Sequence, residues 1–373
     1  MPIDLPHDET RAWLMLLRAP GFGSTGLREL VGRHASAAAA VAAARNESSI
    51  PESARTWLAA PDAAAIKHDL AWLESADHHL IVWSSDDYPA LLRNVPNAPS
   101  ALFVAGNPTH LWSPQIAIVG ARSATAGGLA NARNFARAFV QAGNTITSGL
   151  AEGIDGAAHA AALEAGGATI AVLGTGPDLI YPRQHVELAE RIQAGGALVS
   201  EFPPGTPGKP EHFPRRNRII AGLSLGTLVI EAGLKSGSLI TARLAAEQGR
   251  EVFALPGSIH SPLARGCHRL IRDGAKLIET ADEVLDELHG VGALLADGLR
   301  QRLAFPGGSA QTESNHAHDP DYARLLEATA AAPAAMDELV ARTGLSAAAL
   351  SSMLLVLELE GVMVAENGRY QRR

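Results

Sequence analysis

Residues 115–125 read Gln-Ile-Ala-Ile-Val-Gly-Ala-Arg-Ser-Ala-Thr, an apolar strand-like run that ends at a glycine. Further apolar runs follow it, separated by alanine-rich stretches of helical character, at 145–147, 169–173, 197–199, 227–230 and 251–255. Near-continuous apolar strands that alternate with helices are typical of a parallel sheet covered on both faces. The sequence therefore predicts an α/β fold with an extended Rossmann-like parallel sheet, in a domain that covers residues 81–289.

Two smaller modules flank the predicted sheet. Residues 1–80 have helical apolar spacing and contain the turn Pro-Gly-Phe-Gly-Ser at 20–24, which looks like a helix-hairpin-helix or SAM-like module. The amides of such a turn can hold a phosphate, but many ordinary helix pairs also turn on glycine, and this alternative is favoured. Residues 290–318 have the composition of a linker, and residues 319–373 predict a winged helix.

The charge distribution limits where a polyanion could bind. The formal net charge is −8, and residues 114–289 carry 16 basic and 17 acidic groups, so a phosphate-binding face there must be a local cluster. The acidic flanks argue against a diffuse polyanion-binding surface. Cys267 is the single cysteine, which suits a reducing, cytoplasmic compartment, and no apolar run is long enough to cross a bilayer.

The loops after the predicted strands form the candidate site, because ligands of doubly wound sheets bind beyond the carboxyl ends of the strands. Glycines, hydroxyl donors at helix starts and guanidinium groups all suit phosphate. Such groups at several strand ends predict a polyanion groove more than a single catalytic pocket. The candidates are Gly120 and Arg122 after the first strand, Ser148 and Gly149 after the second, Arg183 after the third, and Ser236 and Gly237 after the fifth.

Residues 213–218 read Phe-Pro-Arg-Arg-Asn-Arg and are the densest basic run of the chain. Three guanidinium groups, an amide and an aromatic ring suit phosphates and a stacked base, which adds Arg215, Arg216, Asn217 and Arg218 to the candidates. The alternative is a helix start whose arginines pair with carboxylates such as Glu231, and it stays open for each arginine.

Asp155 and His159 are four residues apart and share a predicted helix face. They could form a general base, but no nucleophile is adjacent in the sequence. The favoured interpretation is a carboxylate that holds the helix and the preceding loop together. Cys267 and His268 are neighbours without a third ligand at suitable spacing, so no metal site is predicted and Cys267 is expected to be buried.

The ordered set of motifs closely resembles the DNA-processing protein A (DprA/Smf) family over roughly residues 80–280. The motifs are Tyr-Pro at 88–89, Val-Gly-Ala-Arg at 119–122, Ser-Gly-Leu-Ala-Glu-Gly-Ile-Asp at 148–155, Tyr-Pro at 181–182, Phe-Pro-Arg-Arg-Asn-Arg-Ile-Ile-Ala-Gly at 213–222, Ser-Gly-Ser-Leu at 236–239, Pro-Gly at 256–257 and Gly-Cys-His at 266–268. One departure is Gly127-Gly128, where the family usually has a tyrosine.

The resemblance implies a protein that binds single-stranded DNA, forms a homodimer and helps to load the recombinase RecA during natural transformation. It implies no catalytic residues and no cofactor. The family's DNA pocket would correspond to Gly120, Arg122, Ser148, Gly149 and Arg183.

Two enzyme classes are weaker alternatives. The arginine run followed by a strand and Glu231 looks like the arrangement in nucleoside monophosphate phosphoribohydrolases, although their Pro-Gly-Gly-x-Gly-Thr loop is missing. A nicotinamide-dependent oxidoreductase is disfavoured, because the dinucleotide-binding glycine spacing and its acidic residue are not in place.

The winged-helix module carries a prediction of its own. Its recognition helix, expected at 347–360, contains Glu358 and Glu360 and no lysine or arginine. A helix that enters the major groove needs cations or base-reading polar groups. We therefore expect that this helix does not bind duplex DNA, and that Met353, Leu354 and Leu357 form the core of the module or a protein contact.

Overall fold

The computed structural model describes residues 5–44, 47, 50–288, 320–329, 334–345, 350, 353–354, 357, 363–366 and 369–372. The chain divides into two compact units, Met1–Arg302 and Leu303–Arg373. The predicted linker, 290–318, lies outside the described residues. None of the described helices is long and apolar enough to span a membrane.

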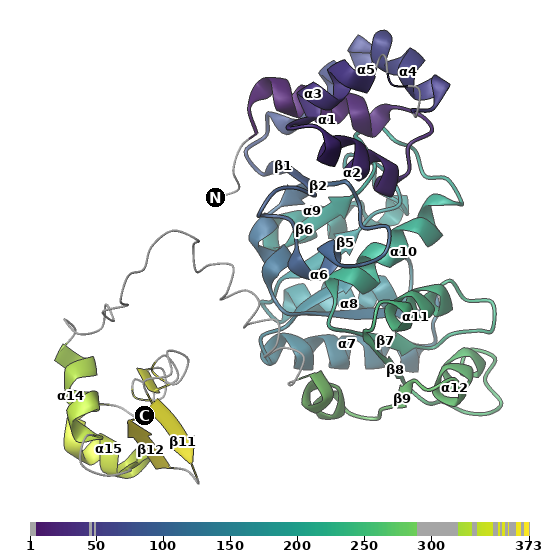
Figure 1. Cartoon of the computed structure of the whole chain (residues 1–373). Helices are drawn as coiled ribbons and strands as arrows, with labels where there is room; N and C mark the ends of the chain where they lie inside the picture. The colour runs from purple at the N-terminus through teal and green to yellow at the C-terminus, as the bar shows by residue number, and fades with distance from the viewer. Residues whose placement is uncertain are drawn as a thin grey trace. The chain divides into compact units, whose positions relative to one another are not determined.

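The first unit is built on a nine-stranded sheet with the order β1-β2-β6-β5-β4-β3-β7-β8-β9 (Figure 1). All six strands predicted for the parallel sheet are present, to within a residue or two at each end. The strands are β1 His78–Val82, β2 Ala101–Gly106, β3 Gln115–Gly120, β4 Thr145–Ser148, β5 Thr169–Val172, β6 Ala197–Ser200, β7 Gly226–Ile230, β8 Glu251–Ala254 and β9 Lys276–Leu277.

The sheet is parallel from β6 to β9 but antiparallel at its other edge, where β1 pairs with β2 and β2 with β6. The predicted parallel sheet is confirmed for the six strands of residues 115–255, and β1 and β2 add an antiparallel edge to it. The connection between β1 and β2 contains only the short helix α6, Ala90–Arg93, and no crossover helix of the length that a parallel return requires.

Helices cover both faces of the sheet, as predicted. Along β3, Ile116 and Ile118 pack in the core beneath one layer of helices, while Ala117 and Val119 pack in the core beneath the other. This alternation is the two-residue period of a strand that is buried on both sides. The first layer holds α7 Ala126–Gln141, α8 Ile154–Glu164 and α9 Val186–Gly195; the second holds α10 His212–Leu223, α11 Ser238–Glu247 and α12 Arg265–Arg272.

The strand order changes direction between β3 and β7, which are hydrogen-bonded neighbours. From β3 the chain builds toward β6 on one side, and from β7 it builds toward β9 on the other. The loops that leave the carboxyl ends of these two strands therefore diverge. Such a switch point opens a crevice in doubly wound folds.

The amino-terminal helices pack on the β1 edge of the sheet (Figure 1). Their core includes Phe103 of β2, and Arg18 forms a bidentate ion pair with the buried Asp69 at 2.6 Å. The helices are α1 His7–Arg18, α2 Ser24–Arg33, α3 Ala37–Ala44, α4 Glu52–Ala59 and α5 Ala63–Leu73.

The turn between α1 and α2 packs against the sheet domain. The carbonyl of Ser24 accepts a hydrogen bond from the Ser100 hydroxyl at 2.9 Å. Gly23 and Ser24 line a small cavity together with the carboxylate of Glu201. This carboxylate is paired with Arg215 and Arg218, and Arg218 donates to the Ser24 hydroxyl at 3.5 Å, so the turn is tied to the sheet domain at two points.

The second unit combines the helices α14 Pro320–Ala328 and α15 Met336–Thr343 with a three-stranded sheet of order β10-β12-β11. The strands are β10 Ala334–Ala335, β11 Met363–Glu366 and β12 Arg369–Arg372. Met353, Leu354 and Leu357 are buried and form part of the core of this unit. Of the two roles expected for them, core or protein contact, the structure supports the core. Glu358 and Glu360 lie outside the described residues, so the expectation for duplex DNA stays a prediction.

Candidate nucleic-acid interface

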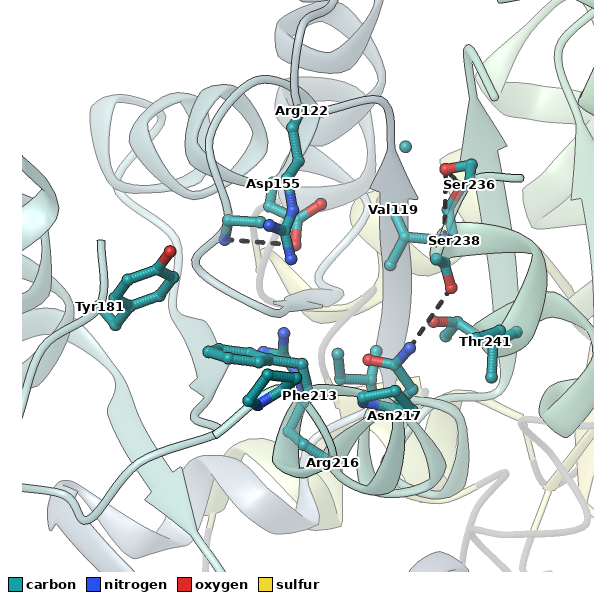
Figure 2. A pocket seen from close by; sticks show the side chains of 17 residues that line it. Val119, Arg122, Asp155, Tyr181, Phe213, Arg216, Asn217, Ser236, Ser238 and Thr241 are labelled. Carbon is teal, nitrogen blue, oxygen red and sulfur yellow. Dashed lines mark hydrogen bonds between the residues drawn. The ribbon is translucent and has the colours of Figure 1, made fainter. Parts of the chain in front are cut away.

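A cavity of about 550 Å³ opens at the switch point, beyond the carboxyl ends of β3 and β7 (Figure 2). Gly120 ends β3 at the cavity wall, and a side chain there would collide with the Ile230 carbonyl and with Ile154. The lining is Val119, Gly120, Arg122, Ala151, Asp155, Tyr181, Pro210, Phe213, Pro214, Arg216, Asn217, Ile220, Ser236, Gly237, Ser238, Ile240 and Thr241.

Arg122 reaches from the β3–α7 loop toward Phe213 of α10 (Figure 2). Its guanidinium carbon lies 6.0 Å from the centroid of the Phe213 ring. The side chain is exposed, and no carboxylate of the described residues lies within ion-pair distance of it. Arg122 therefore presents an uncompensated positive charge at the cavity.

Tyr181 and Phe213 form an aromatic pair beside Arg122. Their ring centroids are 5.3 Å apart with the planes tilted by 48°, and Tyr181 is 51% exposed. The exposed Tyr181 ring is a surface on which a nucleobase can stack.

The N-terminus of α11 forms another wall of the cavity. Gly237 precedes the helix, and the hydroxyls of Ser236 and Ser238 are hydrogen-bonded to each other at 2.7 Å. The amide of Asn217 donates to the Gly237 carbonyl at 3.4 Å and ties α10 to this loop. A helix start with small hydroxyl residues suits an anion.

Arg216 lies beneath the cavity and is buried. Its Nη1 donates to the Gly149 carbonyl at 2.6 Å and also to the Val172 carbonyl, so it links the loops after β4 and β5. A side chain on Gly149 would collide with the guanidinium. Burial lowers the pKa of Arg216 to about 10, against the opposing effect of Asp155, and the group stays charged at neutral pH.

Asp155 holds the same loop from the other side. Its Oδ2 accepts from the amides of Gly149 and Ala151 at 3.1 and 3.4 Å, which confirms the favoured structural interpretation. Burial raises its pKa, and the positive charge of Arg216 opposes that rise. Gly149 is thus fixed at its amide by Asp155 and at its carbonyl by Arg216.

His159 does not act with Asp155 as a general base. Its Nδ1 donates to the Thr169 hydroxyl at 2.7 Å, because that hydroxyl gives its own hydrogen to the Ile146 carbonyl. Burial is the main reason why the pKa of His159 falls to about 3, so the ring is neutral at physiological pH. It is a packing residue of α8.

The neutral ring predicts a pH dependence of stability. The pKa of His159 in the folded chain, about 3, lies below the ordinary 6.5. The neutral ring therefore contributes its full stabilisation of the folded state above pH 6.5, and this contribution is lost as the pH falls toward 3. The slope is about 1.4 kcal/mol per pH unit, or about 2 kcal/mol between pH 6.5 and 5. Urea unfolding at pH 7 and 5 should show this loss in the wild type and in an exposed-histidine control, His260→Asn. A His159→Asn variant with the same loss would contradict the assignment.

The basic run does not act as one cluster, because α10 distributes it around a helix. Arg216 and Asn217 face the cavity, whereas Arg215 and Arg218 point to the opposite side. There both bind one oxygen of the buried Glu201, at 3.0 and 2.6 Å. The expectation that Arg215 and Arg218 belong to the phosphate site is therefore not supported by their positions.

Three further residues named from the sequence, two phosphate candidates and one expected arginine partner, have other surroundings than expected. Ser148 is buried and its hydroxyl donates to the Ile118 carbonyl at 2.6 Å, so it shapes the loop and is not available to a ligand. Arg183 is exposed in the short helix η2, Arg183–His185, which follows Tyr181, but it does not line the cavity. Glu231 pairs with no arginine of the run; its carboxylate binds Thr125.

Sequence reasoning missed two residues that the structure makes important. Tyr181 was noted only as part of a motif, and a tyrosine in a loop after a strand was the available signal for an exposed ring. Glu201 follows β6 directly, but nothing in the sequence indicated that two arginines from α10 would converge on it. Among the described residues no three His, Cys, Asp or Glu side chains gather to hold a metal, and Cys267 is buried with a raised pKa of about 11 caused by burial.

The fold defines a Rossmann-like protein with a cavity at its switch point and a winged-helix unit. Residues 79–289 match the family described as DNA recombination-mediator protein A, and residues 309–369 match the DprA winged helix domain. The chain belongs to the DprA/Smf family of DNA-processing proteins.

Individual relatives agree with this assignment. Protein Smf of Escherichia coli is 44% identical over 309 residues, which cover 83% of this chain and 81% of that protein. The X-ray structure of DprA from Streptococcus pneumoniae aligns with a TM-score of 0.67 at 35% identity, over 77% of this chain and 99% of that one. A Helicobacter pylori DprA structure, described for its single-stranded DNA binding mode, aligns with a TM-score of 0.51 at 27% identity, over 59% and 96%.

Proposed function

We propose that the chain binds single-stranded DNA across the switch-point cavity. The observation that carries the proposal is Arg122, a guanidinium without an ion-pair partner among the described residues, next to the Tyr181–Phe213 ring pair. The charge suits a phosphate and the rings suit a base, so the two halves of a nucleotide have adjacent binding groups. The DNA-binding mode of the Helicobacter pylori relative supports the same ligand.

Direct contacts and supporting contacts differ in this proposal. Arg122, Arg183 and the α11 start at Ser236 and Gly237 would contact phosphates, and Asn217 would orient that start. Gly120, Ser148, Gly149 and Arg216 would shape the loops that carry the contacts. Arg215 and Arg218 stay with Glu201.

An unpaired strand fits the cavity better than a duplex does. The ring pair needs a base whose face is free, and in a duplex the faces are stacked on neighbouring bases. We expect labelled single-stranded oligonucleotides to bind at least about tenfold more tightly than the same sequence as a duplex, with the preference kept at each salt concentration. Equal binding of both forms would contradict the site.

Tyr181→Ala should weaken single-strand binding by roughly tenfold, because one stacked base contributes about 1–3 kcal/mol. The salt dependence should stay unchanged, since no charge is removed. Tyr181→Phe keeps the ring and should bind as the wild type does, and Leu179→Ala removes a neighbouring exposed apolar side chain as a control. A Tyr181→Ala variant with wild-type affinity would remove the stacking role.

The finer parts of the proposal come from the family. We infer that the chain acts in the cytoplasm as a homodimer, protects incoming DNA and helps to load RecA on it during natural transformation. Sedimentation tests the dimer. RecA filament assembly on DNA covered by single-strand-binding protein tests the loading: the chain should shorten the lag, and an unchanged lag would limit the function to binding.

The proposal includes no catalytic step. The phosphoribohydrolase alternative needs Glu231 free at the nucleotide, but both of its oxygens bind Thr125 and it does not line the cavity. We expect no release of adenine from AMP. Adenine release by the wild type that disappears in Glu231→Ala would instead support the phosphoribohydrolase alternative. An increase of the melting temperature on addition of NAD would support the oxidoreductase alternative.

A further inference from the structure

Two helices start beside the switch point, and their N-termini differ. The helix α11 opens into the cavity through Ser236 and Gly237, whereas Thr125 at the start of α7 is bound by the carboxylate of Glu231. Each terminus carries the partial positive charge of a helix start, so each would attract an anion. The first helix after the first strand is also where dinucleotide-binding folds hold the pyrophosphate.

The contacts of Glu231 fill the α7 terminus. Its Oε2 accepts from the Thr125 amide at 2.8 Å and its Oε1 accepts from the Thr125 hydroxyl at 2.5 Å. That hydroxyl in turn accepts from the amide of Gly128 at 3.0 Å. The carboxylate therefore lies over the first turn of α7, in the place of a bound anion.

Two backbone features make this position possible. A side chain on Gly128 would collide with the carboxylate, so Gly127-Gly128, the departure noted in the sequence, leaves room for it. Glu231 itself has a φ of 52°, in the left-handed region that is uncommon for residues other than glycine, asparagine and aspartate. A glutamate in this conformation indicates that its side chain is needed where it lies.

We propose that Glu231 is a specificity-determining residue, an internal anion that excludes phosphate groups from the N-terminus of α7. Its charge repels phosphate and its oxygens occupy the donors that a phosphate would use. The open anion-binding groups are then Arg122 and the α11 start, which line the same cavity. Free nucleotides, nicotinamide dinucleotides and pyrophosphate lose the site that this fold commonly provides for them.

The test uses the full chain and inorganic pyrophosphate as the probe. Glu231→Ala empties the site, Glu231→Gln keeps its shape without the charge, and Glu164→Ala removes an exposed glutamate of α8 as a control of equal net charge. Calorimetry measures affinity, and backbone amide resonances of residues 125–128 report whether the probe binds at α7.

The expected result is saturable pyrophosphate binding to Glu231→Ala, with resonance shifts at 125–128 and at least tenfold higher affinity than in the wild type and Glu164→Ala. Glu231→Gln should gain a smaller part of this binding. If folded Glu231→Gln shows no resonance shifts at 125–128 with pyrophosphate, the proposal is overturned, even if Glu231→Ala does not fold. Pyrophosphate binding at 125–128 in the wild type would overturn it as well. Single-strand binding is measured separately, so failure of the proposed function leaves this test intact.

Discussion

The double variant Arg122→Ala, Arg183→Ala should lose about 25-fold in affinity for single-stranded DNA at about 0.1 M salt. Each phosphate contact adds roughly 0.7 to the slope of log affinity against log salt for single strands, so two lost contacts flatten it by about 1.4. A slope change of 1.4 corresponds to about 25-fold for each decade of salt below 1 M. Both side chains are exposed, so their removal should leave the fold intact.

Arg137→Ala, Arg243→Ala is the matched control for this experiment. These arginines lie on α7 and α11, are 42% and 70% exposed, and pair with Glu164 and Glu247 away from the cavity. The variant removes the same charge, so it corrects for a general electrostatic effect. Fluorescence titrations at three or more salt concentrations measure slope and affinity together. If the two double variants behave alike, the site is wrong.

Arg216→Ala should give the largest loss of stability among the arginine variants, about 3–5 kcal/mol in the free energy of unfolding. The guanidinium is buried and donates to the carbonyls of Gly149 and Val172. Without it these carbonyls lose their donor and the buried Asp155 loses a compensating positive charge, and buried polar groups without partners are costly. The Gly149 loop should also lose its geometry, so single-strand binding should fall further than in the Arg122→Ala, Arg183→Ala double variant.

Urea unfolding checks this expectation, with Arg215→Ala as the control on the same helix. Arg215 is half exposed and shares Glu201 with Arg218, so its removal should cost less than about 1 kcal/mol. A loss of similar size in the two variants would mean that Arg216 is not a structural link between the strand-end loops.

Strand positions were predictable because they depend on local pattern. The apolar runs around Ile116, Ile146, Ile170, Leu198 and Leu228 all became strands, since a strand buried on both faces needs apolar residues without interruption. The antiparallel edge of β1 and β2 and the two-residue β9 were not predicted. Their pairing depends on the length of the connections and on neighbouring strands, which no local pattern contains.

The site was predictable as a set of loops but not as a set of contacts. Gly120, Arg122 and Gly237 meet at one cavity because carboxyl ends of parallel strands share one edge of a sheet. The run at 213–218 was interpreted as one basic cluster, and the helix turned Arg215 and Arg218 away from Arg216. A helix rotates successive residues by about 100°, so neighbours in sequence face different surroundings.

For this chain the sequence alone determined the order of strands and helices along the chain, the flanking modules and the edge of the sheet where the cavity opens, because each follows from periodicity and chain order. Tertiary structure alone decided which charges are available. Glu201 pairs with two arginines and Glu231 closes the start of α7, while Arg122 has no ion-pair partner among the described residues. The physical reason is that an ion pair depends on distances of a few ångströms between residues far apart in the chain.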